Sequence, residues 1–329
     1  MTETNTTTTE LIKAGIVGTG YAASQRADTL QKDWRSHLVA ISSHTLTRAQ
    51  AFAQTYETSF IDSWQQLIEH PDIDVVFICT INCDHGVIAR AALETGKHVV
   101  TEYPLSLNPS EAESLIALAQ AKGKLLHVEH IELLGGLHQA LLQFLPKIGK
   151  PFYARYVTMV PKKPAPKRWT YHPELFGFPF KAALPHVHRF TNLFGQVASV
   201  SCQSQFWSNC EYYKACLCNG QMRFQNGLIA EVTYGKGETF NQALRHFEVH
   251  AEEGTLIFEG PQGTMIQGED RKPIEIAGRR GLFVKDTEMV LDYLLARKPL
   301  YVSPIDSYYA LMVADNLCKS AKTGKTIAM

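Results

Sequence analysis

The stretch Thr101–Leu134, TEYPLSLNPSEAESLIALAQAKGKLLHVEHIELL, decides how the rest of the chain is organised. Its middle is a well-marked helix. Asn108 is a favoured N-cap residue, Pro109 suits the first turn, and Glu111 stands where the acid of a capping box would reach back. Apolar residues recur at helical spacing after it, and Gly123 is a typical stop. We therefore predict a helix that ends at Gly123, with a strand on each side.

Polar side chains stand where those two strands end. Glu102-Tyr103-Pro104 follows the first strand. Glu129, His130 and Glu132 lie near the end of LLHVEHIELL, which we interpret as a strand leading into a new domain. Parallel sheets bind ligands at the carboxyl ends of their strands. We therefore predict that this segment is the hinge between a cofactor site and a substrate site.

Upstream, Lys13–Gly20 (KAGIVGTG) is an apolar strand that runs into glycines. The sequence continues through Thr19, Tyr21 and Ala22 to Ala23, which fits the form G-x-G-x-x-A. In such a motif Gly18 permits the tight turn, Gly20 lets the backbone approach a pyrophosphate, and Ala23 keeps helix and strand close. The amino end of the following helix offers free N–H groups to phosphates. Because this motif begins a repeating β-α pattern, it predicts a dinucleotide site.

The second strand, His37–Ser42, indicates which dinucleotide is bound. NAD-binding proteins carry an acid about 20 residues beyond the glycines, where it holds the ribose 2′-hydroxyl. Here Ser42, Ser43 and His44 occupy that place, with Arg48 close behind. Hydroxyls and a cation suit a 2′-phosphate, so we expect NADPH to be preferred over NADH. The alternative is that Arg48 is a solvated residue of the helix at 48–56.

The third strand, Asp74–Thr80, is a continuous apolar run, as expected of a buried parallel strand. It ends in Thr80, Ile81 and Asn82, which we place beside the nicotinamide. His85 opens the next helix, and it could contact the ligand or cap that helix. Together these features predict a Rossmann domain over residues 11–128, after a disordered tail at residues 1–10.

After residue 130 the periodicity becomes that of strands. Pro151–Val160 alternates, Asn226-Gly227 lies between MRFQ and LIAEVTYG, and Glu253-Gly254 lies between HFEVHA and TLIFEG. These are hairpin signals. They predict an α+β domain with a large, mainly antiparallel open sheet over residues 129–329. Two helices at about 287–296 and 306–321 finish the chain and could pack back on the first domain.

A predicted helix at 180–193 supplies the main candidates for substrate contact in this second domain. His188 and Arg189 share a helical face there, whereas His186 points elsewhere and is expected at the surface. Before that helix, Lys163 and Arg168 belong to a basic loop that could hold a carboxylate-bearing ligand, and Trp169 begins an aromatic loop that could face a flat conjugated ligand. The alternatives are a solvated loop for the former and a small core for the latter.

Composition and spacing exclude several classes of function. Lys plus Arg equals Asp plus Glu, at 32 each, so net charge gives no reason to expect nucleic acid or a membrane as partner. The seven cysteines lack paired CxxC spacing, which fits reduced thiols in a cytoplasmic protein. His127 and His130 would face opposite sides of a strand, so we expect no metal. No apolar run is long enough to span a bilayer.

With GIVGTGYAA, GKHVVTEYPL and the strand-rich second half in view, the chain resembles the glucose–fructose oxidoreductase and inositol dehydrogenase family. The resemblance implies a Rossmann domain followed by an α/β domain on an open, mainly antiparallel sheet. The common central motif of the family is Glu-Lys-Pro, whose lysine serves the substrate hydroxyl being oxidised. Tyr103 stands in the place of that lysine, which argues against sugar-alcohol oxidation.

Glu-Tyr-Pro resembles instead the biliverdin reductase branch of the family, in its cyanobacterial type. Further similar segments are GKLLHVEHIELLGG, RWTYH, FGFP, RFTNLFG, AEVTYGKGE, GTLIF and RRGLF. The resemblance implies NADPH-dependent reduction of the central methine bridge of biliverdin, a linear tetrapyrrole, to give bilirubin. Arg189 matches the arginine considered important in the branch, and it would orient the substrate or a proton-delivering water.

The same resemblance suggests roles for the hinge residues. Tyr103 would hydrogen-bond to the pigment or pack against it, and Glu102 and Glu129 are the carboxylates best placed to act through water. His130, His188 and the basic loop complete the expected substrate contacts. The alternatives are an NAD(P)-dependent sugar or polyol dehydrogenase and a non-catalytic dinucleotide-binding regulator. We expect a monomer.

Overall fold

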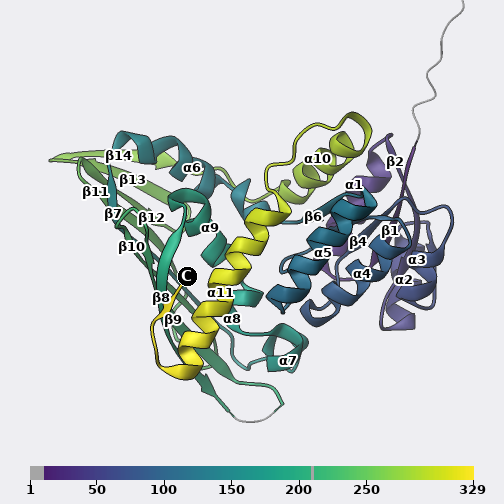
Figure 1. The fold of residues 1–329 in the computed structure, drawn as a ribbon, viewed down its shortest axis with the longest axis horizontal. Helices are drawn as coiled ribbons and strands as arrows, with labels where there is room; N and C mark the ends of the chain where they lie inside the picture. The colour runs from purple at the N-terminus through teal and green to yellow at the C-terminus, as the bar shows by residue number, and fades with distance from the viewer. Residues whose placement is uncertain (1–10, 209–210) are drawn as a thin grey trace, which may run out of the picture.

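The computed structural model describes residues 11–208 and 211–329, so the predicted tail at residues 1–10 lies outside the described residues. Figure 1 shows two halves side by side, each built on one β-sheet. The long helix α11 (Pro304–Thr323) runs between them.

The first half contains a six-stranded sheet with the order β3-β2-β1-β4-β5-β6, in which every bonded pair is parallel. This is the strand order of the Rossmann fold, as predicted. The strands are β1 (Ile12–Val17), β2 (Ser36–Ser42), β3 (Ser59–Phe60), β4 (Val75–Ile78), β5 (His98–Thr101) and β6 (Leu126–Val128). All four residues of β4 are buried, in keeping with its apolar sequence.

Helices connect these strands and cover the sheet. They are α1 (Tyr21–Lys32), α2 (Leu46–Thr55), α3 (Trp64–Glu69), α4 (His85–Glu94) and α5 (Pro109–Lys122). Helix α5 begins and ends as predicted, with the Asn108 side chain accepting from Ser110 N and Gly123 in the left-handed region. The predicted capping box does not form. Ser106 Oγ already takes the N–H of Asn108, and Glu111 accepts from that same hydroxyl.

The second half contains a nine-stranded sheet with the order β14-β13-β12-β11-β7-β10-β9-β8-β15. Its strands are β7 (Pro151–Pro161), β8 (Val197–Trp207), β9 (Ala215–Phe224), β10 (Ile229–Gly237), β11 (Leu244–Ala251), β12 (Gly254–Glu259), β13 (Gln262–Gln267), β14 (Asp270–Glu275) and β15 (Ile327–Ala328). Strands β7 and β10 are parallel and the other bonded pairs are antiparallel. The predicted hairpins at Asn226-Gly227 and Glu253-Gly254 join β9 to β10 and β11 to β12.

The remaining helices are α6 (Gly136–Phe144), α7 (Pro173–Phe176), α8 (Pro179–Ala182), α9 (Pro185–Phe194) and α10 (Leu282–Ala296). The single helix predicted at 180–193 is therefore wrong. The helical segment is interrupted between α8 and α9. Pro185, which has no N–H to donate, is the first residue of α9.

The strand predicted over LLHVEHIELL is also shorter than expected. Strand β6 ends at Val128, and residues Ile131–Leu133 form a single 3-10 turn. The Glu129 carboxylate accepts from Ile131 N at 2.6 Å and so stabilises this turn. Because of this turn, Glu129 faces the first half and Glu132 faces the second half.

The two C-terminal helices join the halves. Helix α10 packs on α1, and α11 packs on α5, α9 and β8. Two ion pairs connect α10 to the first half, Arg26 with Asp286 and Arg35 with Asp292. In Figure 1, α10 lies beside α1 although some 260 residues separate them in the sequence.

Candidate active site

The glycine loop between β1 and α1 has the geometry of a phosphate cradle. Gly18 has a φ of +123°, and a Cβ there would lie 2.1 Å from the carbonyl oxygen of Cys79, so only glycine fits. Gly20 precedes α1 without a side-chain cap, and a Cβ on it would meet nothing within 4 Å. The amino end of a 12-residue helix is therefore open to an anion. These features fit the pyrophosphate of a dinucleotide.

Hydroxyls and cations gather where the adenosine ribose of such a dinucleotide would lie. Ser43 Oγ and Thr19 Oγ1 are 3.2 Å apart, and Ser42 is buried with its carbonyl accepting from Gly18 N. His44 Nε2 lies 2.7 Å from Asp84 Oδ2, which ties up the nearby carboxylate. Arg48 is exposed on α2. This set of groups suits a 2′-phosphate better than a bare hydroxyl.

The residues after β4 hold the hinge rather than offering free polar groups. His85 is fully buried, with Nδ1 2.8 Å from Pro104 O and Nε2 3.2 Å from Thr80 O. Its ring therefore connects the end of β4 to the Glu102–Pro104 turn. Asn82 Nδ2 donates to Phe176 O at 2.9 Å, so it fixes the aromatic loop of the second half to the cofactor side. Ile81 precedes the 3-10 turn that begins with Asn82.

Glu102 and Glu129 are neighbouring carboxyls at the hinge. Glu129 is fully buried, its Oε1 accepts from Ile131 N, and its Oε2 has no hydrogen-bond partner among the described residues, whereas the Glu102 side chain is partly exposed. Burial raises the pKa of both carboxyls, and Arg26, whose Nη2 lies 3.5 Å from Glu102 Oε1, opposes that rise at Glu102. Two neighbouring carboxyls that are shielded from water cannot both ionise at low cost. Burial favours the protonated form of Glu129, and Glu102 is the carboxyl that faces Arg26.

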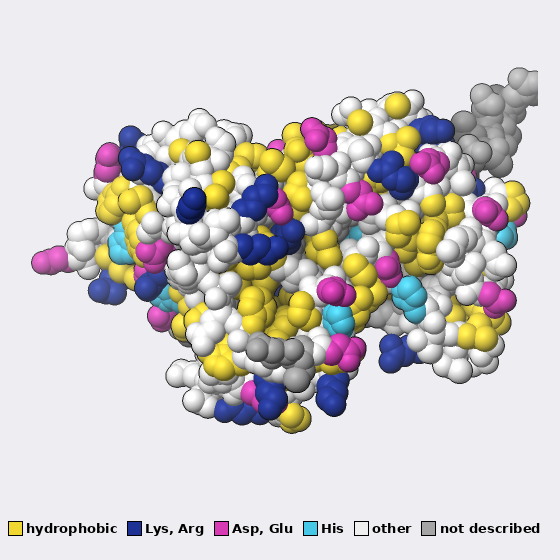
Figure 2. Space-filling view, turned by 60° about the horizontal axis from the view of Figure 1, so that its bottom comes forward, with side chains coloured by type: hydrophobic (Ala, Val, Ile, Leu, Met, Phe, Trp, Pro, Cys, Tyr) yellow, Lys and Arg dark blue, Asp and Glu magenta, His cyan; other side chains and the backbone are white. Residues whose placement is uncertain are grey.

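The hinge opens on one side into a cavity of about 720 Å³ in the second half. Tyr103 forms its edge toward the first half, and strands β7, β10 and β11 with helix α9 form its walls. The lining residues are Tyr103, Glu132, Tyr156, Thr158, Met159, Val160, Pro161, Ala183, Pro185, His186, Arg189, Tyr234, Ala243, Leu244, Arg245, Glu259, Gly260 and Arg279. In Figure 2, dark-blue Lys and Arg side chains gather near the middle of the face shown, above yellow hydrophobic ones.

Three arginines meet one carboxylate in this cavity. Glu132 accepts from Arg189 Nη2 at 3.5 Å, from Arg245 Nη2 at 3.4 Å, and from Arg279. The four side chains carry two positive charges in excess. Arg189 is 1% exposed, and its Nε and Nη1 find no hydrogen-bond partner among the described residues. Burial lowers the pKa of Arg189, yet a guanidinium stays protonated in proteins.

Part of the cavity wall, in contact with Arg189, is aromatic. The His186 ring stacks on Tyr156 with centroids 5.0 Å apart, and its edge meets Tyr234. Its Nε2 lies 3.0 Å from Thr158 Oγ1 and its Nδ1 3.1 Å from Ala183 O. Burial lowers the pKa of His186 to about 4, so the ring is neutral at pH 7. The prediction that His186 lies at the surface is wrong, because α9 starts at Pro185 and places it in the first turn.

Several predicted substrate residues do not line the cavity. His130 lies behind Tyr103, stacked on it at 5.7 Å and 2.8 Å from Ser307 Oγ, and His188 packs edge-on against His130. Lys163 donates to Asn241, Arg168 to Thr170, and Trp169 packs on Phe176. The structure thus brings together Tyr103 and Arg189 and leaves these five outside the wall.

Sequence reasoning missed the other charged members of the wall. Arg245 and Arg279 give the cavity the positive charge that was expected from the basic loop. Arg279 lies in RRGLF, one of the segments that carry the family resemblance, but no local pattern marks it as a cavity residue. Glu132 was noted at the hinge, and its role as the shared partner of three arginines depends on the fold.

Within residues 11–208 and 211–329, no group of three or more His, Cys, Asp or Glu side chains could hold a metal ion. In the same part of the chain, no helix has the length and apolar character to cross a membrane.

A Rossmann half with an open dinucleotide loop, followed by an open-sheet half with a cavity next to the hinge, defines an NAD(P)-dependent oxidoreductase. Family models agree with this class. The model of an oxidoreductase family with an NAD-binding Rossmann fold matches residues 12–130, and the model of its C-terminal alpha/beta domain matches residues 146–329. The chain belongs to this family, that of glucose–fructose oxidoreductase and inositol dehydrogenase.

Individual relatives narrow the comparison. A crystal structure of biliverdin reductase from Synechocystis sp. PCC 6803, in complex with biliverdin and NADP+, is 53% identical, with a TM-score of 0.93 over 94% of this chain and 99% of that one. Biliverdin reductase A of Mus musculus is 27% identical over 86% of this chain and 85% of its own length. Levoglucosan dehydrogenase in complex with NADH and levoglucosan, at 17% identity, a TM-score of 0.84 and coverage of 97% and 99%, shares the fold.

Proposed function

We propose that the chain reduces biliverdin to bilirubin with NADPH, by transfer of a hydride to the central methine carbon and of a proton to a pyrrole nitrogen. The observation that carries this proposal is the cavity next to the hinge, where three arginines face one carboxylate and an aromatic wall. It occurs in a chain 53% identical to a biliverdin reductase whose structure holds biliverdin and NADP+.

The charges of the cavity match the substrate. Biliverdin carries two propionates, and Arg189, Arg245 and Arg279 exceed Glu132 by two positive charges. The unpartnered Nε and Nη1 of buried Arg189 can donate charge-assisted hydrogen bonds to a propionate or to an ordered water. The flat conjugated pigment can stack on the wall formed by Tyr156, His186 and Tyr234.

The chain's own residues must orient the pigment and supply one proton, since the reaction consumes NADPH, one proton and biliverdin and yields NADP+ and bilirubin. The nicotinamide supplies the hydride when it is bound. Arg189 is too weak an acid to give up a proton, so we assign it to orienting the substrate. The Glu102–Glu129 pair retains a proton in a buried place next to Tyr103, and it can pass that proton on through Tyr103 or water.

The two alternatives explain less of the site. A sugar or polyol dehydrogenase needs a group that takes the proton of the substrate hydroxyl, and burial raises the pKa of Tyr103, which stands in the place of the lysine. A regulator that only binds a dinucleotide has no need for a cavity lined by a buried arginine whose Nε and Nη1 have no partner among the described residues. The expectation of a monomer stays a prediction.

The direct test is to mix the purified protein with biliverdin and NADPH and to follow the visible spectrum. We expect a change from blue-green to yellow that needs both protein and NADPH and is slower with NADH. The absence of any change, with NADPH binding still detectable, would overturn the proposal and favour a dehydrogenase or a regulator.

Arg189→Lys gives a sharper comparison in the same assay. Lysine keeps the charge but cannot present the planar fork of donors. Loss of one charge-assisted hydrogen bond costs about 1.5–3 kcal/mol, so we expect kcat/KM for biliverdin to fall about 10- to 100-fold, with the Kd for NADPH unchanged. An unchanged kcat/KM would remove Arg189 from the site.

A further inference from the structure

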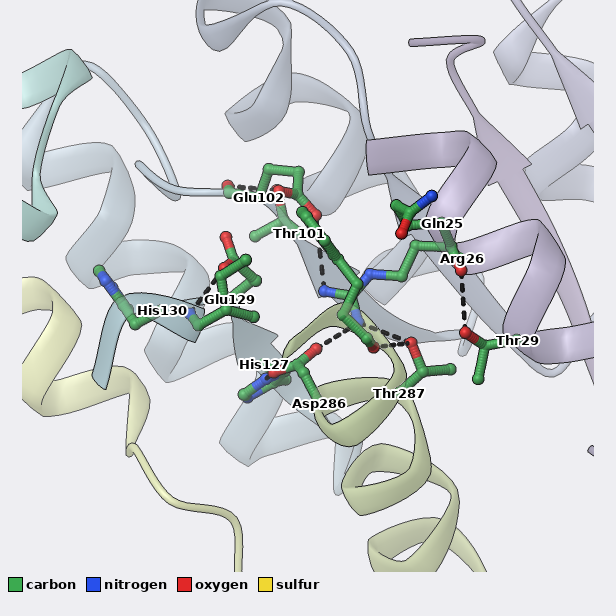
Figure 3. A network of polar contacts seen from close by, with 12 residues as sticks. Gln25, Arg26, Thr29, Thr101, Glu102, His127, Glu129, His130, Asp286 and Thr287 are labelled. Atoms are coloured by element: carbon green, nitrogen blue, oxygen red, sulfur yellow. Dashed lines mark hydrogen bonds and ion pairs between the residues drawn. The ribbon is translucent and has the colours of Figure 1, made fainter. Parts of the chain in front are cut away.

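Asp286, on the C-terminal helix α10, lies in the middle of a buried polar network beneath the hinge (Figure 3). Its Oδ2 accepts from Arg26 Nη1, and its Oδ1 accepts from Tyr301 OH at 2.6 Å and lies 2.8 Å from His127 Nε2. Thr287 Oγ1 is a second partner of Arg26 Nη1, at 2.8 Å. Neither Asp286 nor Arg26 lines the cavity or the glycine loop.

The guanidinium of Arg26 is shared between two carboxylates. Nη1 contacts Asp286, while Nη2 lies 3.5 Å from Glu102 Oε1. Arg26 is 0% exposed, its Nε has no hydrogen-bond partner among the described residues, and the rings of Phe77 and Phe283 lie over it. Water therefore does not solvate this cation. The part of the Arg26 positive charge that Asp286 neutralises is therefore not available to stabilise an ionised Glu102.

The surroundings of the Glu102–Glu129 pair hold few other charges. Arg26 from α1 and Asp286 from α10 are the charged groups closest to it, and the other titratable groups that face it are His127, Cys79, Tyr103, Tyr301 and Glu132. Glu132 is itself neutralised by its arginines. Two buried carboxyls, Glu129 and Asp286, and the partly exposed Glu102 thus share one buried arginine, and such a balance favours retention of one proton.

We propose that Asp286 is a positioning residue of the reductase: by holding Arg26, it limits the positive charge that reaches Glu102 and Glu129 and so keeps a proton on that pair. The inference rests on the proposed function for its consequence in turnover. The protonation of the Glu102–Glu129 pair is independent of the proposed function, because it can be measured without substrate.

The direction of the effect follows from Coulomb's law. Asp286→Asn removes a negative charge near Glu129 and also releases Arg26 toward Glu102. Both changes stabilise the ionised form of the pair, so its pKa falls, by about one unit for a charge removed at roughly 10 Å in a medium of effective dielectric near 20. Turnover that needs the shared proton then declines at a lower pH than in the wild type.

The experiment compares Asp286→Asn with Asp292→Asn. Asp292 lies on the same helix and pairs with Arg35 and Lys298, so its variant also removes an ion pair between α10 and the first half without touching Arg26. The protein is labelled with carbon-13 at glutamate side-chain carboxyls, and their titration is followed by NMR. The pH profile of kcat and the Kd for NADPH are measured for each variant.

We expect the highest-pH carboxyl midpoint and the alkaline limb of the kcat profile to move down together, by about one unit, in Asp286→Asn only. Equal midpoints in wild type and Asp286→Asn would overturn the inference, as would an equal shift in Asp292→Asn. If Asp286→Asn does not fold, Tyr301→Phe replaces it. Tyr301→Phe removes one hydrogen-bond donor from Asp286, so more of the Asp286 negative charge acts on Arg26. Less positive charge then reaches Glu102 and Glu129, and the carboxyl midpoint must rise.

The two failures are distinguishable. A wild type that does not convert biliverdin contradicts the proposed function, while the NMR midpoints still decide whether Asp286 controls the pair. If the wild type converts biliverdin but Asp286→Asn leaves the carboxyl midpoints unchanged, the inference is wrong and the proposed function is retained.

Discussion

Glu132 is the residue that lets three arginines share one cavity. Their guanidinium groups would repel one another at close range, and the carboxylate between them offsets that repulsion while leaving two positive charges uncompensated. Arg189 is held from inside the protein, whereas Arg279 comes from the exposed segment before α10. The site is therefore arranged before the substrate arrives, which reduces the ordering cost of binding.

Arg48 tests the basis of cofactor choice. Its exposed guanidinium on α2 is expected to bind the 2′-phosphate of NADPH. For Arg48→Ala we predict that KM for NADPH rises about 10-fold, the effect of losing roughly 1.4 kcal/mol, while KM for NADH is unchanged. Arg90→Ala is the control, since Arg90 on α4 donates to Ser114 away from the cofactor loop. An equal effect on both cofactors would show that Arg48 does not read the phosphate.

At the scale of elements, Lys236 of β10 holds the aromatic loop onto the second sheet. Its Nζ lies 3.7 Å from the centre of the Phe176 ring and 4.7 Å from that of Tyr171, and it donates to Thr170 O. Asn82 binds the same loop from the first half. Trp169 and its neighbours therefore connect the halves and do not form the cavity wall.

This arrangement gives stability a pH dependence. Burial lowers the pKa of Lys236 from 10.5 to about 8, so between those values the unfolded chain binds a proton that the folded chain has lost. Stability attributable to Lys236 must then rise with pH across this window and stay constant below it. We predict that the free energy of unfolding of wild type, relative to Lys236→Met, increases by about 3 kcal/mol from pH 8 to 10.5.

Urea unfolding at several pH values measures that difference. Lys214→Met is the control, because it removes an exposed lysine close to the same loop. A flat difference for Lys236→Met would mean that the folded protein keeps this ammonium charged.

Some elements of the fold could be predicted from the sequence and others could not. The Rossmann half was predictable because its signals are local, with glycines at Gly18 and Gly20, an apolar β4 and a capped α5. The hairpins of the second sheet were predictable for the same reason. The break between α8 and α9 was not, since Pro185 is tolerated both at the start of a helix and after a turn. Because the helix is interrupted there, the His186 side chain faces the cavity.

At the scale of the whole molecule, the least predictable contacts join residues far apart in the chain. Arg26 meets Asp286, and Glu132 meets Arg245 and Arg279, across 113 to 260 residues. A charged residue on a predicted helix is ordinarily solvated, so nothing in the local pattern distinguishes Arg26 or Asp286 from surface charges. Only the docking of α10 on α1 buries them, and that docking depends on the path of the entire second half.

That path also explains where the site lies. The glycine loop belongs to the first half and the cavity to the second, and Tyr103 of the Glu102–Pro104 turn lines the edge of the cavity. The family resemblance indicated the reaction and Arg189, and the fold adds Arg245 and Arg279 to the same cavity.

The measurement that bears most directly on the reaction uses NADPH that carries deuterium at the transferable position of the nicotinamide. The protein is mixed with this cofactor and biliverdin, and the product is examined by mass spectrometry. Hydride transfer to carbon predicts bilirubin that retains a single deuterium, located at the central bridge. Yellow product without deuterium, or no product from the labelled or the unlabelled cofactor, would contradict direct reduction of biliverdin by this chain.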